Sequence, residues 1–215
     1  MSACVIFDCD GTLVDSETLC NQAFVALLRD LGVEERTEAL VERYRGAKLQ
    51  SILDDLQNRH GLTLPEGFVA DYRALVTQLF ENELKPVTGV AEALEKIRMP
   101  MCVASSGPPE KIVQALRVAG LARYFGSNLF SSYQVGSWKP EPGLFLAAAT
   151  AMGVAAADCI VVEDSPVGIA AAKAAGMRAL WFEPGRRHPA EIEPDVVAFG
   201  DMALLPELIL DLALD

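Results

Sequence analysis

Two carboxylates stand two residues apart near the start of the chain, in segment 7–13 (FDCDGTL). Side chains at i and i+2 of an extended strand point to the same side, so Asp8 and Asp10 are expected to lie together. Crowded carboxylates repel each other and are costly to bury, and a divalent cation with a preference for hard oxygen ligands, such as magnesium, would offset that cost. Gly11 would allow close approach of the backbone, and Thr12, counted among the substrate-binding residues, would offer a hydroxyl to the site. The spacing by itself is also typical of a turn that ends a strand.

Two serines follow a second apolar run, in segment 103–109 (VASSGPP). The hydroxyl of Ser105 and the backbone N–H that follows it would form a small cradle for an anion where a strand turns into a helix. Ser106 lies in the same turn and is counted among the substrate-binding residues. A loop without function has the same Ser, Gly and Pro composition, so this segment carries weight only beside the others.

A lysine and an acidic pair complete the candidate chemical groups. Lys139 lies in segment 138–142 (WKPEP), where two prolines predict a stiff, non-helical backbone that would hold the ammonium in place. Glu163 and Asp164 end the apolar run of segment 160–168 (IVVEDSPVG), just before a helix that is expected to begin near its proline. The alternative for this acidic pair is a cap that interacts favourably with the helix dipole.

The elements that must position these groups alternate along most of the chain. Short apolar runs predict strands, and four of the five are almost continuously apolar, as is typical of parallel strands buried on both faces. The expected strands are 3–7, 101–104, 128–130, 159–162 and 179–182. Helix-length segments occur at 90–98, 110–119, 143–152 and 167–175, and several end at a glycine. This alternation predicts an open, Rossmann-like, doubly wound α/β core with a parallel sheet.

One long interval, 16–84, contains no strand pattern. Its apolar residues recur instead at helical spacing, in three stripes. Segment 85–89 (KPVTG) then reads as the linker back to the core. We therefore expect an α/β core formed by 1–15 and 85–215, with an inserted helical cap domain formed by 16–84.

Parallel strands place their carboxyl ends along one edge of the sheet, where ligands bind in open α/β folds. The candidate groups are expected to meet at this edge; they are Asp8, Asp10, Ser105, Lys139 and Asp164. One lysine, one serine and several carboxylates around a cation make a poor structural core and a suitable site for phosphoryl transfer. The sequence therefore predicts phosphoryl-transfer chemistry.

The four segments, in this order, resemble the motifs of the haloacid dehalogenase-like hydrolase superfamily over essentially the whole chain. The helical insertion resembles the cap of the sugar phosphatase and β-phosphoglucomutase branch. The resemblance implies a phosphohydrolase in which Asp8 is the nucleophile and carries the phosphoryl group as an aspartyl-phosphate, while Asp10 is the general acid and base. It also implies that Ser105 and Lys139 hold the phosphoryl group.

The same resemblance implies a magnesium cofactor and its ligands. Asp8, Asp164 and the main-chain carbonyl of Asp10 would bind the ion, with Glu163 in support. Positive charge from the metal and from Lys139 would offset the repulsion between Asp8 and an anionic phosphate. Asp10 would give a proton to the leaving alcohol and then take one from water.

Substrate selection is expected in the cap. Segment 45–49 (RGAKL) resembles the specificity loop of the family, and Arg45 or Lys48 would contact a hydroxyl or a carboxylate of the substrate; the alternative is a solvated helix start. Ser16 would line the entry near the hinge. We expect the substrate to be a sugar or sugar-acid phosphate monoester, with the cap closing over it and limiting solvent.

Three other functions share parts of this pattern. A mutase of the β-phosphoglucomutase type is the main alternative, but Cys20 occupies the position at which that branch has a histidine in the first cap helix, which favours a phosphatase. A phosphonatase would replace the second acid, which is present as Asp10. A non-catalytic sugar-phosphate binder could dispense with the nucleophile, yet Asp8 is retained.

Composition limits the classes of partner and compartment. The chain has 30 acidic and 18 basic residues, a formal charge of −12, and no basic stripe of the kind that binds nucleic acid. Five cysteines without a CxxC pair favour free thiols in a cytoplasmic protein. No stretch approaches the ~20 apolar residues of a membrane span, and the start of the chain does not read as a leader. We expect a small phosphate ester as partner, no nucleic acid or membrane, and a monomer or weak homodimer.

Overall fold

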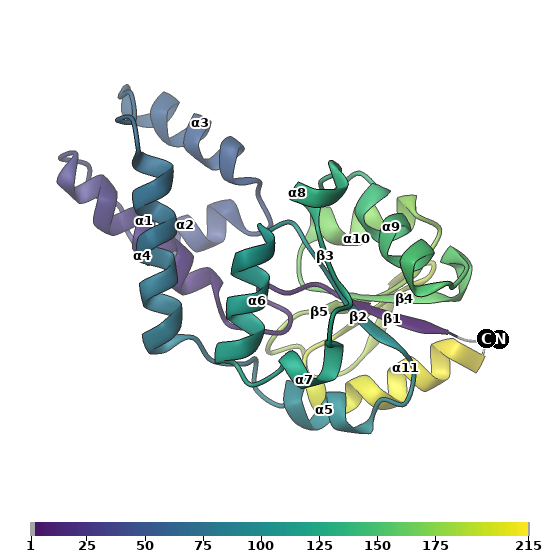
Figure 1. Ribbon diagram of the computed structural model, residues 1–215. Helices are drawn as coiled ribbons and strands as arrows, with labels where there is room; N and C mark the ends of the chain where they lie inside the picture. Colours follow the sequence, from purple (N-terminus) through teal and green to yellow (C-terminus); the bar gives the residue numbers. More distant parts are fainter. Residues whose placement is uncertain (1–2, 215) are drawn as a thin grey trace.

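A seven-stranded sheet forms the centre of the computed structural model, which describes residues 3–214 (Figure 1). The strand order is β3-β2-β1-β4-β5-β7-β6, and neighbours pair in parallel except for β6 and β7. The strands are β1 Cys4–Phe7, β2 Met101–Ser105, β3 Leu129–Ser131, β4 Cys159–Glu163, β5 Arg178–Phe182, β6 Ala190–Glu193 and β7 Val196–Phe199. The doubly wound α/β core expected from the sequence is confirmed.

Alternating side chains on the central strand β1 enter two apolar layers. Val5 and Phe7 face one layer, while Cys4 and Ile6 face the other. Helices α5, α6, α7 and α11 cover the first layer, and α9 and α10 cover the second. These helices and α8 are α5 Val90–Lys96, α6 Pro109–Val118, α7 Ala122–Phe125, α8 Ser132–Val135, α9 Gly143–Met152, α10 Pro166–Ala174 and α11 Leu205–Leu214, with short 3-10 turns at Ala156–Asp158 and Met202–Leu204. Coverage of both faces explains the almost continuous apolar runs of the central strands.

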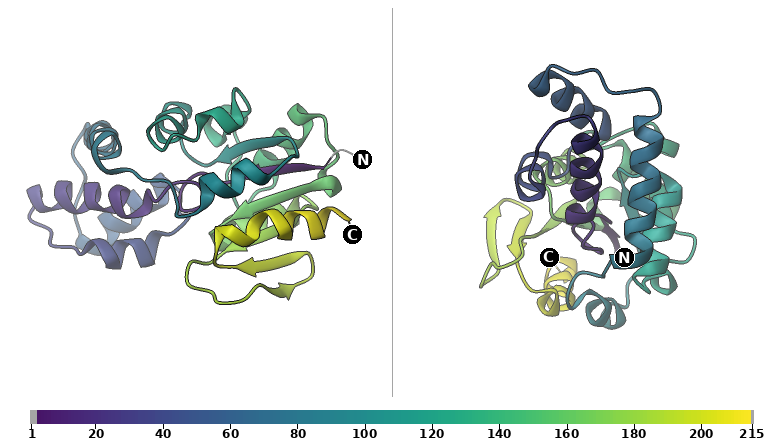
Figure 2. Two further views of the ribbon diagram at one scale, coloured as in Figure 1. Left: turned by 90° about the horizontal axis from the view of Figure 1, so that it is seen from below. Right: turned by 90° about the vertical axis from the view of Figure 1, so that its left-hand side faces the viewer.

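Four helices between β1 and β2 form a separate lobe beyond one end of the sheet (Figure 2). They are α1 Glu17–Asp30, α2 Thr37–Tyr44, α3 Leu49–His60 and α4 Phe68–Glu83. The lobe has an apolar cluster of its own, in which the rings of Phe24 and Tyr72 stack with centroids 4.1 Å apart. It meets the core where Gln114 of α6 donates to the Thr77 carbonyl at 3.0 Å and to Glu81 at 2.7 Å. This lobe is the helical insertion expected after the first strand.

Two strands at one edge of the sheet were not expected from the sequence. β7 pairs in parallel with β5, and β6 returns antiparallel to β7 with an irregular register at Glu191 and Glu193. Most of β6 is exposed, so it lacks the buried, alternating face that makes a strand visible in a sequence. Among the helices of residues 3–214, none has the length and hydropathy that crossing a membrane requires.

Candidate active site

The carboxyl ends of the central strands bring the predicted charged residues together. Asp8 follows β1, Glu163 ends β4, and Lys139 arrives from the loop before α9. The ammonium of Lys139 donates to Asp8 Oδ1 and, at 2.6 Å, to Glu163 Oε1. All three side chains are buried, with at most 8% of any of them exposed. A buried lysine therefore bridges two carboxylates that are far apart in sequence.

Burial and neighbouring charge act in opposite directions on the Asp8 carboxyl. Burial raises the pKa of Asp8, the charge of Lys139 lowers it, and Glu163 and Asp10 raise it, so that the pKa lies at about 7. For Lys139 burial lowers the pKa, but the charges of Asp8 and Glu163 outweigh burial and raise the pKa above its ordinary value. Lys139 therefore stays protonated beside Asp8.

Glu163 has both carboxylate oxygens engaged by the protein. Oε1 accepts from Lys139, and Oε2 accepts from the Ser165 backbone N–H at 2.6 Å and the Ser165 hydroxyl at 2.9 Å. Ser165 also caps α10 by accepting from the Gly168 N–H at 3.1 Å. A Cβ at Gly168 would overlap the Glu163 carboxyl, so the close packing of α10 on this group requires a glycine. These contacts make Glu163 an anchor for Lys139.

Asp164, the next residue, is held from the turn after β1. The hydroxyl of Thr12 donates to Asp164 Oδ1 at 3.2 Å, and the indole N–H of Trp181 donates to the Asp164 carbonyl at 3.2 Å. Gly11 has a φ of 81°, and a Cβ there would lie 2.7 Å from Asp164 Cγ. Burial first, and then the charges of Glu163 and other carboxylates, raise the pKa of Asp164 well above its ordinary value.

The second aspartate has different neighbours from the first. Asp10 Oδ1 accepts from the Ser16 hydroxyl at 2.5 Å and from Lys111 Nζ at 2.7 Å. Burial alone raises the pKa of Asp10, but the charge and hydrogen bond of Lys111 and the hydrogen bond of Ser16 outweigh it and lower the pKa. Sequence reasoning missed Lys111. A lysine in the first turn of a helix carries no signal that separates it from a surface residue.

The serine turn lies at the same edge of the sheet. Ser105 is buried at the end of β2, and its Oγ accepts from the Gly107 N–H at 3.0 Å. The Gly107 carbonyl accepts from the Ser131 hydroxyl at 2.6 Å, which ties the turn to β3. Ser106 lines the cavity described below. A hydroxyl and neighbouring N–H groups held in this way can bind a phosphoryl oxygen.

The carboxylates fit a hard divalent cation. Asp8 and Asp164 are buried oxygen donors, and burial first, followed by the charges of neighbouring carboxylates, raises the pKa of both. A cation bound between them would offset both effects. Within residues 3–214, no group of three or more His, Cys, Asp or Glu side chains is arranged to hold a metal ion. The ligand set implied by the family resemblance differs from such a group, because it has two carboxylates and a main-chain carbonyl, that of Asp10.

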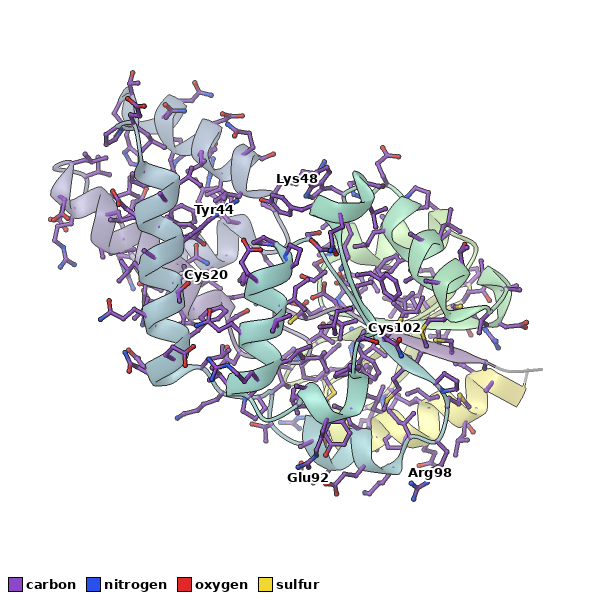
Figure 3. All side chains as sticks on the ribbon, in the orientation of Figure 1. Cys20, Tyr44, Lys48, Glu92, Arg98 and Cys102 are labelled. Atoms are coloured by element: carbon purple, nitrogen blue, oxygen red, sulfur yellow. The ribbon has the colours of Figure 1, made fainter. Side chains whose placement is uncertain are left out.

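A cavity of about 810 Å³ lies between the cap and the core above these groups. It is lined by Asp8, Asp10, Ser16, Ser105, Ser106, Lys139, Glu163 and Asp164 together with cap residues that include Lys48 and Arg73. Figure 3 shows Lys48 at the junction between the cap and α8. Its ammonium lies 5.5 Å from the centroid of the Trp138 ring. Lys48 therefore lines the cavity, and its expected contact with a substrate stays a prediction.

Two other predicted substrate-binding residues do not line this cavity. Thr12 is fully buried and directs its hydroxyl to Asp164. Arg45 lies beside Glu17, with 3.5 Å between the charged groups, and 3.9 Å from Asp164 Oδ2. Both residues interact with Asp164 instead, because the turn after β1 and the cap loop approach it from two sides.

Comparison with known proteins gives consistent matches along the chain. The family model of the haloacid dehalogenase-like hydrolases matches residues 3–176. The chain is 38% identical to the 6-phosphogluconate phosphatase of Escherichia coli strain K12 over 95% of its length and 93% of that protein. It is 31% identical to a phosphorylated carbohydrates phosphatase of Thermotoga maritima, over 96% of both chains. Among solved structures, a haloacid dehalogenase-like protein of unknown function from Agrobacterium tumefaciens aligns with a TM-score of 0.83 and 30% identity, over 99% of this chain and 100% of that one.

Proposed function

The chain belongs to the haloacid dehalogenase-like hydrolases, and on that basis we propose that it is a magnesium-dependent phosphatase of sugar and sugar-acid phosphate monoesters. The observation that carries the proposal is the hydrogen bond of Lys139 to Asp8. A second carboxyl nearby, that of Asp10, accepts instead from Lys111. One carboxylate next to a buried ammonium can attack a phosphate, and a separate one can move the proton.

The proposed reaction has two displacements at phosphorus. Asp8 attacks the phosphoryl group, forming an O–P bond while the bond to the sugar oxygen breaks. Asp10, which must hold a proton for this step, gives it to that oxygen. Asp10 then takes a proton from water, the water oxygen bonds to phosphorus, and the bond to Asp8 breaks to release phosphate. Lys139 and Ser105 hold the phosphoryl oxygens in both steps. The aspartyl-phosphate on Asp8 is the intermediate.

The proposed magnesium site uses Asp8, Asp164 and the main-chain carbonyl of Asp10. When bound, magnesium would supply positive charge that offsets the repulsion between the phosphate and the carboxylates. Thr12 and Gly11 support this role through Asp164, since one donates to it and the other leaves room for it. In this proposal Glu163 contributes indirectly, by holding Lys139.

The cavity and its charges support a sugar-acid phosphate as substrate. A volume of about 810 Å³ accommodates a six-carbon ester. Within residues 3–214, Lys48 and Arg73 line the cavity and neither has a carboxylate within 4.0 Å. Both can therefore receive a substrate carboxylate remote from the phosphate. The name of the Escherichia coli relative, a 6-phosphogluconate phosphatase, agrees with this chemistry.

We also propose that residues 16–84 act as a cap that closes over the ester. Contacts such as that between Gln114 and the Thr77 carbonyl hold the two lobes together and would limit solvent at the phosphorus. The cap boundaries follow from the first cap helix and the return linker. A soluble phosphate ester, rather than nucleic acid or membrane, is the proposed partner of this cavity.

Phosphate release from a panel of esters tests the proposal. The panel contains 6-phosphogluconate, glucose 6-phosphate, a hexitol phosphate, phosphoglycolate and a nucleotide, each with magnesium and with EDTA, and Asp8→Asn as the control. We expect release with magnesium, the highest kcat/KM for the sugar acid, and no turnover by Asp8→Asn. Absence of release from every ester, or wild-type turnover by Asp8→Asn, would contradict the proposal. Conversion of β-glucose 1-phosphate to glucose 6-phosphate without net phosphate release would identify the mutase alternative.

A further inference from the structure

The first turn of α6 places a lysine on the second aspartate. Lys111 Nζ lies 2.7 Å from Asp10 Oδ1, the oxygen that also accepts from the Ser16 hydroxyl at 2.5 Å. One donor comes from the core helix that follows the serine turn, and the other from the residue that begins the cap. Two donors from opposite sides of the hinge thus meet on a single carboxylate oxygen.

The other oxygen of Asp10 faces the turn that holds Ser105. A Cβ at Gly107 would lie 3.8 Å from Asp10 Oδ2 and 3.3 Å from Ser105 Oγ, so both groups approach the same glycine. Oδ1 is therefore engaged by the protein, while Oδ2 is directed to the region in which the proposed phosphoryl group is held. The two oxygens of Asp10 thus have different roles, and the donors to Oδ1 fix which oxygen faces the phosphoryl group.

Lys111 is itself held from several sides. Its ammonium lies 5.6 Å from the centroid of the Phe80 ring of α4. Tyr72 of α4 and Cys20 of α1 lie beside the ammonium, and Figure 3 labels Cys20. Lys111, Tyr72 and Cys20 all line the cavity. The Lys111 side chain thus extends from the core into the interface with the cap.

We propose that Lys111 is a positioning residue for the reaction: together with Ser16 it holds Oδ1 of Asp10, so that Oδ2 faces the leaving oxygen and afterwards the attacking water. The inference rests on the proposed phosphatase function and assigns Lys111 a part in it that acts through Asp10. Lys111 is not required to contact the ester, because its ammonium is already paired.

This role predicts a distinctive kinetic pattern. Removing the ammonium should allow Asp10 to rotate, and kcat for a sugar phosphate should fall roughly 10- to 100-fold, as misplaced acid–base groups do. KM should change less than about threefold, because the ester loses no contact. With p-nitrophenyl phosphate the phenolate leaves without a proton, so the first burst of product should keep its rate while later turnovers slow.

A double-mutant cycle separates positioning from binding or simple stability. The variants are Lys111→Met, Lys111→Arg, Asp10→Asn and the double variant Asp10→Asn/Lys111→Met, with Lys96→Met on the exposed face of α5 as the matched control. We expect Lys111→Arg to recover most of the rate, Lys96→Met to match the wild type, and the double variant to lose no more than Asp10→Asn alone. Thermal melting checks folding, and Lys111→Gln replaces Lys111→Met in the cycle if the latter is unfolded.

Three outcomes would overturn the role of Lys111. They are an unchanged kcat in Lys111→Met, a loss confined to KM, and losses that multiply in the double variant. The last two would identify a residue that binds substrate directly. A wild-type protein that hydrolyses no ester would instead refute the proposed function before any variant is compared.

Discussion

Replacing Gly168 by alanine is expected to destabilise the protein and slow it, although alanine is the better helix former. A helical Gly→Ala change favours folding by up to about 1 kcal/mol. Here the new Cβ would overlap the Glu163 carboxyl, which accepts from Lys139 and twice from Ser165. Overpacking costs about 1–3 kcal/mol, and loss of one hydrogen bond to a charged group costs about 1.5–3 kcal/mol. Overpacking and hydrogen-bond loss together outweigh the gain in helix propensity, and we expect the free energy of unfolding to fall by roughly 2–4 kcal/mol.

The displacement of Glu163 should also lower turnover, because Glu163 holds Lys139. Moving Glu163 removes one of the two carboxylates that hold the ammonium beside Asp8. A shift of about 1 Å in a positioning group lowers turnover by as much as roughly 10²-fold, so kcat should fall 10- to 100-fold with magnesium saturating.

Urea unfolding and steady-state phosphate release measure the two effects. Ala170→Gly is the matched control, because Ala170 is an exposed residue of the same helix. The control should lose up to about 1 kcal/mol of stability and keep the wild-type kcat. A Gly168→Ala protein that is as stable as the wild type and equally active would refute the inferred packing of α10 against Glu163.

Three further predictions follow from the site. In metal-free protein the free energy of unfolding should fall as pH rises from 3.8, the ordinary pKa of an aspartate, toward 7, because the pKa of Asp8 is raised to about 7 and the folded state keeps a proton that the unfolded chain has released. Magnesium, which needs the carboxylate form, should therefore raise Tm more at pH 8 than at pH 5, and equal shifts at both would contradict this. Gly46→Ala should lower kcat/KM roughly tenfold at unchanged core stability. Gly46 has a φ of 69°, and a Cβ there would lie 2.7 Å from Ser165 Cβ and hinder the approach of the cap. A wild-type kcat/KM would exclude that contact. Asp10→Asn should lower turnover roughly 10²- to 10⁴-fold and leave a phosphorylated protein detectable by intact mass after reaction with p-nitrophenyl phosphate; turnover within a few-fold of wild type would remove Asp10 from the acid–base role.

Local sequence patterns were sufficient to predict the core and the groups at its edge. The runs before Asp8, Ser105 and Glu163 are apolar on both faces because the sheet is covered on both sides, and each run ends where a polar residue meets the cavity. The spacing of apolar residues depends only on nearby positions in the chain. The succession of strands and helices along the sequence, and the helical insertion after the first strand, could therefore be predicted from it. The contact of Lys139 with Asp8 agrees with the expectation that the candidate groups meet at one edge of the sheet, and Lys139 reaches that edge from the loop before α9.

Other features depend on partners that are remote in sequence. The β6 strand is mostly exposed and exists through its pairing with β7. Thr12 has a hydroxyl that could contact a substrate. The turn after β1 instead lies against the end of β4, and the Thr12 hydroxyl donates a hydrogen bond to Asp164. Lys111 resembles any surface lysine until the docking of the cap on α6 encloses it beside Asp10. Tertiary structure decided these roles, because a hydrogen bond or a steric contact depends on which distant segments meet, and spacing along the chain carries no record of that meeting.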